Sequence, residues 1–356
     1  MPRGALKLVP VLLLLSLAAC AETAPPAAPL LEPLPGARVW PGPPEPARYA
    51  YAGQLLGEKD FIGERPTRDT VLDVLRWVAG LIIGPPSYIE LQRPVSGMSD
   101  ANGRILVVDA GVKAVIVFDM KERRVLRWKQ ATPNNEFAAP VAICGDGRGG
   151  FLVTDSELRE VFHLDAAGKP IGRFGHAALE RPTGIARDPS SGSIYVTDTA
   201  QHQIMVFDDG EQLRTTIGRR GGDSGEFNFP TLLAFANQEL YVADTLNFRV
   251  QVIERGGNDR LVFGELGLYI GNMTRPKGVS VGRDGRIYVI ESYFDHLLVF
   301  DREGKLLLPI GGEGKDIGQF YLPSGVWTDT VGRVYVADMF NGRVVVFKEL
   351  GAEQPI

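Results

Sequence analysis

The chain has 356 residues, of which 44% are hydrophobic and 23% are charged, a composition typical of globular rather than disordered proteins. Its formal net charge of −5 gives no basic surface of the kind that binds nucleic acid, so no nucleic-acid partner is expected. Two cysteines are too few for a disulfide framework.

Residues 1–19 have the features of an export signal. Arg3 and Lys7 precede an apolar run that is too short to span a membrane. The sequence Leu17-Ala-Ala-Cys20 that follows resembles the bacterial lipobox, which implies that Cys20 is acylated and begins the mature protein. An ordinary signal peptide with a chance cysteine is the alternative.

The segment after Cys20 is rich in Pro and Ala, which predicts an extended tether over residues 20–47. The chain is therefore expected to be exported and lipid-anchored to the cell envelope. In a Gram-negative source, resemblance to other lipoproteins implies that Ala21 after the cysteine directs the protein to the outer membrane.

From residue 94 onward the chain repeats itself six times. Each repeat begins at a proline, and the prolines are 42 to 48 residues apart: Pro94, Pro140, Pro182, Pro230, Pro276 and Pro323. An acid follows each proline by 14 to 16 residues, at the end of a β-rich run: Asp109, Asp155, Asp198, Asp244, Glu291 and Asp338. A bulky apolar residue follows each acid by nine positions. Four short strands for each repeat of about 46 residues predict the blades of a β-propeller.

Two of the repeats resemble a known family. Asp244-Thr-Leu-Asn-Phe-Arg-Val-Gln-Val-Ile and Asp338-Met-Phe-Asn-Gly-Arg-Val-Val-Val-Phe are similar to the NHL repeat, and the resemblance covers residues 94–347. It implies an all-β, six-bladed propeller. The Asn-His pair of the family motif is complete in no repeat, so no ligand is carried over from it.

The sixth repeat lacks its fourth strand, which predicts that the N-terminal segment 48–57 supplies it and closes the ring. The propeller would then span residues 48–350, followed by a tail at 351–356. Seven blades are the alternative, because Pro46 precedes Pro94 by 48 residues. Helical spacing of apolar residues predicts one insertion helix at 67–83, which either covers the ring or contacts a membrane.

The six acids are interpreted as structural, since a carboxylate that enters a short loop accepts backbone N–H bonds and recurs wherever the loop recurs. Basic residues and one histidine in the same loops form a candidate ligand-binding face: Arg93, Arg181, His202, Arg219, Arg249, Arg275, Lys277 and Arg343. Arginine binds carboxylates and phosphates through two hydrogen bonds. Pairing of these cations with nearby acids is the alternative.

The sequence predicts no catalytic residue, metal ligand or cofactor. None of the common catalytic motifs occurs, and only two of the four histidines are expected to share a face, whereas a zinc site needs three or four ligands. The favoured function is a membrane-anchored, non-catalytic scaffold for an envelope protein or polysaccharide. The alternative is an envelope enzyme that resembles the propeller lactonases or lyases, with a metal near the central axis.

Overall fold

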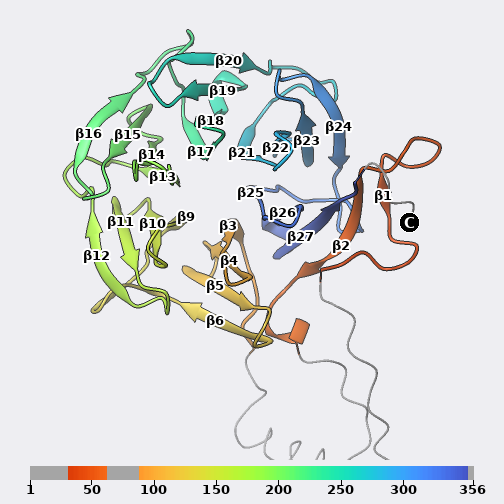
Figure 1. Cartoon of the computed structure of the whole chain (residues 1–356), viewed down its shortest axis with the longest axis horizontal. Helices are drawn as coiled ribbons and strands as arrows, with labels where there is room; N and C mark the ends of the chain where they lie inside the picture. The colour runs from red at the N-terminus through yellow and green to blue at the C-terminus, as the bar shows by residue number, and fades with distance from the viewer. Residues whose placement is uncertain (1–30, 62–87, 352–356) are drawn as a thin grey trace, which may run out of the picture.

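The computed structural model describes residues 31–61 and 88–351, and these residues form a six-bladed β-propeller. Six sheets surround a central axis, each with its first strand innermost (Figure 1). The expected all-β class and six repeats are confirmed, and seven blades are excluded. The signal segment, Cys20, the predicted helix at 67–83 and residues 352–356 lie outside the described residues. No helix among the described residues is long and apolar enough to cross a membrane.

Equivalent strands occupy equivalent places in the blades. The innermost strands are β3 (Pro94–Ser99), β9 (Pro140–Gly145), β13 (Pro182–Arg187), β17 (Pro230–Ala236), β21 (Pro276–Val281) and β25 (Val326–Thr328). The second strands are β4 (Arg104–Asp109), β10 (Phe151–Asp155), β14 (Ile194–Asp198), β18 (Glu239–Asp244), β22 (Ile287–Glu291) and β26 (Arg333–Asp338).

The third strands are β5 (Ala114–Asp119), β11 (Glu160–Leu164), β15 (Gln203–Phe207), β19 (Arg249–Glu254), β23 (His296–Phe300) and β27 (Arg343–Glu349). The outermost strands of the first five blades are β6 (Arg124–Trp128), β12 (Pro170–Phe174), β16 (Leu213–Ile217), β20 (Asp259–Phe263) and β24 (Leu306–Gly311). A small hairpin, β7 (Gln130–Thr132) with β8 (Asn135–Glu136), connects the first two blades. Three short 3₁₀ helices complete the described elements: η1 (Glu58–Phe61), η2 (Thr245–Asn247) and η3 (Met339–Asn341).

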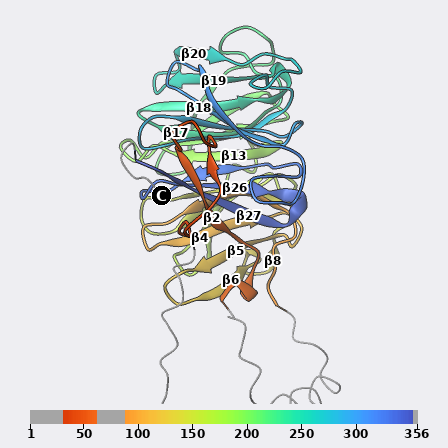
Figure 2. The same cartoon turned by 90° about the vertical axis from the view of Figure 1, so that its right-hand side faces the viewer.

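The ring is closed by the N-terminal strand β2 (Tyr49–Leu55), which pairs antiparallel with β27 of the last blade. In Figures 1 and 2, β2 lies on the outer rim beside β27. The pairing satisfies an edge that the last blade would otherwise leave open. The closing strand expected within 48–57 is therefore present.

The tether predicted for residues 20–47 is wrong over residues 31–47, where the chain packs against the last blade. The short strand β1 (Val39–Trp40) pairs with β2 and gives this sheet a fifth strand. Trp40 is buried, with its ring centroid 5.2 Å from that of Phe347. Leu31 is also buried. The tether was predicted from the high proline and alanine content of the segment, which does not indicate that Leu31 and Trp40 are buried.

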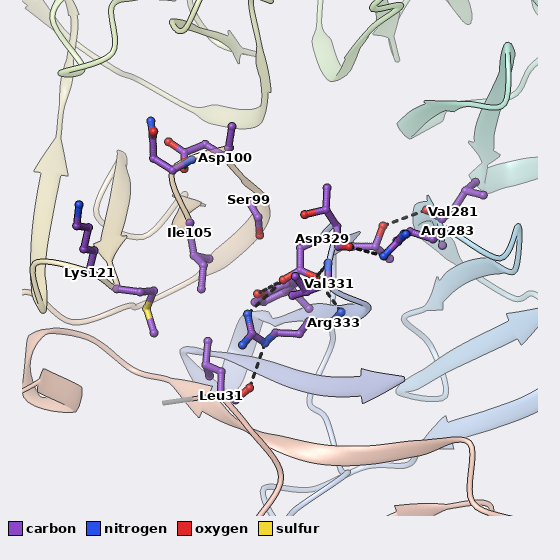
Figure 3. A pocket seen from close by; sticks show the side chains of 18 residues that line it. Leu31, Ser99, Asp100, Ile105, Lys121, Val281, Arg283, Asp329, Val331 and Arg333 are labelled. Carbon is purple, nitrogen blue, oxygen red and sulfur yellow. Dashed lines mark hydrogen bonds and ion pairs between the residues drawn. The ribbon is translucent and has the colours of Figure 1, made fainter. Parts of the chain in front are cut away.

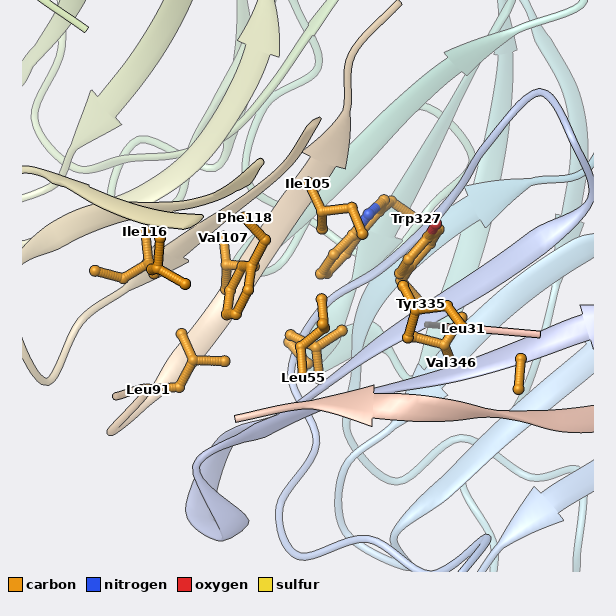
Figure 4. Close-up of a cluster of buried hydrophobic side chains, with 14 of the residues drawn as sticks. Leu31, Leu55, Leu91, Ile105, Val107, Ile116, Phe118, Trp327, Tyr335 and Val346 are labelled. Atoms are coloured by element: carbon orange, nitrogen blue, oxygen red, sulfur yellow. The ribbon is translucent and has the colours of Figure 1, made fainter. Parts of the chain in front are cut away.

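Apolar layers between neighbouring blades form the core. At the junction of the last and first blades, Leu31 and Leu55 from the N-terminal segment pack with Ile105, Phe118 and Tyr335 (Figure 4). Strands buried on both faces account for the continuous Val and Ile runs of the sequence. The N-terminal segment thus contributes both hydrogen bonds and apolar area to the closure.

Five of the six described innermost strands, all except β25, have a β-bulge near their start. In β13, β17 and β21 the ladder is interrupted between the initial proline and the third residue after it, as expected because proline has no N–H to donate. Residues in the bulge are released from strand pairing. Two of them bond around the axis: Thr183 Oγ1 donates to the Thr231 carbonyl (3.1 Å), and Thr231 Oγ1 donates to the Lys277 carbonyl (2.9 Å).

Candidate functional site

The predicted site residues come from two sets of loops that meet at one end of the ring. In every blade, a residue one or two positions after the loop acid donates its backbone N–H to the chain just before the innermost strand. The six pairs are Ala110–Arg93, Ser156–Ala139, Thr199–Arg181, Leu246–Asn228, Ser292–Arg275 and Phe340–Tyr321, with N···O distances of 2.9–3.1 Å. We call this end of the ring the loop face.

The six loop acids are almost completely buried and accept hydrogen bonds that hold these loops together. Asp109 accepts from the backbone amides of Gln92 (2.7 Å), Arg93, Gly111 and Val112. Asp155 and Asp198 repeat this arrangement. The carboxylates therefore face backbone donors within their own blades.

Arg249 and Arg343, two of the predicted ligand-binding residues, are occupied by contacts within the chain. Arg343 Nε donates to Asp338 (2.7 Å), and its Nη atoms donate to the carbonyls of Lys315, Asp316 and Gln319. Arg249 makes the corresponding bonds to Asp244 and to the carbonyls of Gly222, Asp223 and Glu226. Both guanidinium groups thus fasten the long loop that leads into the innermost strand.

His202 and Arg219 also have partners within the chain. His202 is buried, and its Nδ1 accepts a hydrogen bond from the Phe229 amide at 3.1 Å. Burial, together with the charge of Arg220, lowers the pKa of His202, so the ring is neutral at pH 7. Arg219 is largely exposed and pairs with Glu226 at 2.8 Å.

Four of the predicted cations at the loop face have side-chain donors that are not used by the described residues. Arg93 and Arg181 are exposed, and neither side chain has a hydrogen-bond or ion-pair partner among the described residues. Arg275 is half-buried and donates from Nε to Ser292 Oγ at 3.0 Å. Lys277 is half-buried, and its pKa is lowered by burial and by the positive charge of Arg275.

The sequence prediction missed an apolar surface on the same face. The second residue after the loop acid is Gly111, Glu157 or Ala200 in the first three blades, but Leu246, Tyr293 or Phe340 in the last three. These three large side chains are 43%, 56% and 51% exposed. The fold does not require apolar residues here, because the equivalent position tolerates glycine, glutamate and alanine.

A second apolar element lies in the connection from β20 to β21, beside the loop of the fifth blade that carries Tyr293. Leu268, Tyr269 and Ile270 are 81%, 85% and 65% exposed. These residues line a small cavity of about 80 Å³ together with Glu291, Phe294 and His296 from the adjoining loop of the fifth blade. We call Leu246, Tyr293 and Phe340, with Leu268, Tyr269 and Ile270, the apolar arc. Exposed apolar patches of this kind mark interaction surfaces.

The largest cavity described lies at the opposite end of the ring. Its volume is about 850 Å³, and it is lined by loops of the first, fifth and sixth blades and by Leu31 (Figure 3). The Tyr335 hydroxyl donates to Asp329 there (2.8 Å), and Arg333 pairs with Glu32. None of the predicted site residues lines this cavity. Within the described part of the chain, no group of three or more His, Cys, Asp or Glu side chains is placed to hold a metal ion.

Comparison with known proteins agrees with the repeat seen in the structure. The model of the NHL repeat matches residues 179–207, which run from the loop before β13 to the end of β15. A curated relative, peptidylglycine alpha-amidating monooxygenase of Rattus norvegicus, is 29% identical in an alignment 154 positions long, which covers 38% of this chain and 16% of the relative. The chain thus spans less than a fifth of that protein.

Solved structures show the same fold. A streptogramin B lyase structure has a TM-score of 0.56 and 13% identity, and the match covers 74% of this chain and 95% of the lyase chain. An auxiliary nutrient binding protein from Bacteroides thetaiotaomicron has a TM-score of 0.57 and 12% identity, covering 72% of this chain and 69% of that one. The chain is therefore a six-bladed β-propeller, and residues 179–207 within it match the NHL repeat.

Proposed function

We propose that this chain is an envelope-anchored, non-catalytic binding protein that docks a partner protein through the apolar arc. The observation that carries the proposal is the exchange of Gly, Glu and Ala for Leu, Tyr and Phe at one structural position in three consecutive blades. Exposed apolar side chains cost solubility, and burial at an interface recovers about 25 cal/mol for each Å² of apolar surface.

The composition of the arc favours a protein over a polysaccharide. Three of its six members are aliphatic (Leu246, Leu268 and Ile270), and an aliphatic side chain offers no flat ring on which a sugar stacks. Tyrosine and phenylalanine are enriched in the buried centres of protein–protein interfaces. Shared architecture with an auxiliary nutrient binding protein supports a binding role, and the likeness to a lyase supports the enzyme alternative to the same degree.

The experiment is crosslinking in native membranes with a photoreactive residue at position 181, which is exposed on the loop face just before β13. The test variant is Leu246→Ser/Tyr293→Ser/Phe340→Ser. The matched control is Ile171→Ser/Leu213→Ser/Leu307→Ser, whose side chains are 58%, 43% and 48% exposed on outermost strands. We expect the crosslinked protein to be retained by the control and lost by the test variant.

Equal crosslinking by both variants would place the docking surface outside the arc. Capture of a polysaccharide instead of a protein would contradict the choice of partner. If neither is captured, assays for bound metal and for lactone hydrolysis would decide whether the enzyme alternative holds.

A further inference from the structure

Lys277 occupies a position where the fold requires no charge. It is the first residue after the proline that begins β21, and its equivalents in the other blades are Val95, Val141, Thr183, Thr231 and Ser324. It lies in the bulge between Pro276 and Val279, so it is released from strand pairing. The equivalent Thr183 and Thr231 side chains bond to the next innermost strand around the axis. At this position, Thr183 and Thr231 direct their side chains toward the neighbouring innermost strand at the loop face.

The Lys277 ammonium has no acidic partner among the described residues. No hydrogen bond or ion pair joins it to that part of the chain, and the nearby charge that affects it is the positive Arg275. Glu291, the loop acid of the same blade, directs its carboxylate at the backbone amides of Arg275, Tyr293 and Phe294 (2.6–3.2 Å). A half-buried cation beside a second cation destabilises a fold unless a counter-ion is supplied.

Arg275 has N–H donors that the described residues leave free to bind such a counter-ion. Its Nε and Nη2 atoms bond to Ser292, whereas Nη1 has no partner among the described residues. Ser292 is followed by Tyr293 of the apolar arc. The two cations therefore lie at the axial end of the surface on which the partner is proposed to dock.

We propose that Lys277 and Arg275 form a binding site for an oxyanion, a carboxylate or a phosphate, at the axial mouth of the loop face. An ammonium and a guanidinium together neutralise the anion and hold two of its oxygens. The anion is either a free small acid or an acidic group of a docked partner. The site is independent of the proposed protein partner, because small anions test it in the purified protein.

The test follows Lys277 directly. Reductive ¹³C-methylation of the purified protein gives each lysine an NMR signal, and the Lys277 signal is identified by its loss in Lys277→Met. Acetate and inorganic phosphate are titrated separately, with sodium chloride at equal ionic strength as the reference. We expect either oxyanion to shift the Lys277 signal and to raise the pKa of its amine, and chloride to do neither.

Thermal unfolding gives a second readout. Phosphate should raise the melting temperature of the wild type above its value in sodium chloride and leave that of Lys277→Met unchanged. Without oxyanion, Lys277→Met should melt higher than the wild type, which a purely structural lysine would not do. The control Lys305→Met removes an exposed lysine from the turn before β24 and should keep the full phosphate response.

An unshifted Lys277 signal with both anions would overturn the proposal. So would equal loss of the phosphate response in the two lysine variants. To separate the two sources of the anion, the crosslinking experiment is repeated with Lys277→Met: reduced crosslinking assigns the anion to the partner, and unchanged crosslinking assigns the site to free small acids.

Discussion

The loop acids show how single residues set the shape of the loop face. Each carboxylate accepts hydrogen bonds from several backbone amides that would otherwise donate to water. Charged acceptors make stronger hydrogen bonds than neutral ones. In the fourth and sixth blades, asparagine and arginine join the acid: Asn247 Nδ2 donates to the Gly221 carbonyl, and Asn341 Nδ2 donates to that of Gly314, each at 2.8 Å. These residues stabilise the loops from beneath and leave the outer surface to other side chains.

Asp338→Asn should destabilise the ring by about 3 kcal/mol, because it leaves the buried Arg343 guanidinium without its anion. The measurement is the free energy of unfolding in urea. Asp223→Asn is the control, since Asp223 is exposed and its carboxylate makes no hydrogen bond to the described residues. A loss of similar size in both variants would contradict the role given to the acid.

A second carboxylate should make stability depend on pH. Burial alone would raise the pKa of Asp146, but hydrogen bonds from His163 Nε2 (2.9 Å) and from the amides of Arg148 and Gly150 hold that pKa below its ordinary value. A lowered carboxyl pKa stabilises the fold above the unfolded-state value of about 3.9, and this stabilisation is lost as the pH falls below it. Asp146→Asn should therefore be less stable than the wild type at pH 7.

Unfolding curves measured from pH 7 down to about pH 3 test this expectation. The difference between the two proteins should shrink as the pH falls below about 3.9, because the unfolded wild type then takes up a proton at Asp146. A difference that stays constant with pH would mean that Asp146 acts through packing and not through its charge.

At the scale of elements, the closing strand β2 joins the two ends of the propeller. Strand β2 pairs with β27 along its length and buries Tyr49, Ala50, Ala52 and Leu55. Leu55 belongs to the apolar cluster that joins the last blade to the first. Loss of this contact should therefore reduce the packing of two blades, the last and the first.

Leu55→Ala should cost about 2–5 kcal/mol, the usual range for a leucine removed from a core. The next residue is a matched control, because Leu56 is 40% exposed whereas Leu55 is fully buried, and Leu56→Ala should change stability by about 0.5 kcal/mol or less. Equilibrium denaturation distinguishes the two. Equal effects would mean that the closure does not depend on this junction.

The fold was predictable because the prolines, the acids and the apolar positions keep one register through six repeats. The missing fourth strand of the last repeat pointed to the alternating segment Tyr49–Leu55. The ligand face was less predictable, because a sequence does not tell whether Arg249 reaches solvent or a loop carbonyl. The apolar arc had a signal, the change from small to large residues two positions after the acid, but it is visible only when the six blades are aligned.

At the scale of the whole molecule, the described chain begins at the cavity end of the ring, opposite the loop face. Its first residue, Leu31, lines the large cavity. If Cys20 carries the proposed lipid, only ten residues separate it from Leu31, and ten residues extend over at most about 36 Å. We therefore expect the cavity end to face the membrane and the apolar arc to face away from it.

Single cysteines at positions 293 and 331 test this orientation, since Tyr293 lies on the loop face and Val331 lines the cavity. Burial raises the pKa of the native Cys144 thiol to about 12, so Cys144 should not react near neutral pH. A fluorophore at position 331 should be quenched by nitroxide lipids, and one at position 293 should not. Cys20→Ala, which should also fail to incorporate labelled fatty acid, should abolish the quenching; quenching that persists would contradict the anchor.

The position of β2 in the chain has a consequence for biosynthesis. Of the described strands, only β1 leaves the ribosome before β2, and the partner strand β27 leaves after all the others. Until β27 has been synthesised, β2 has no strand to pair with. The ring therefore cannot close before translation has passed Glu349. A chain that cannot complete its tertiary structure during synthesis stays compatible with passage through a narrow secretion channel. If the chain is exported as proposed, the pairing of β2 with β27 would therefore also delay completion of the ring until after export.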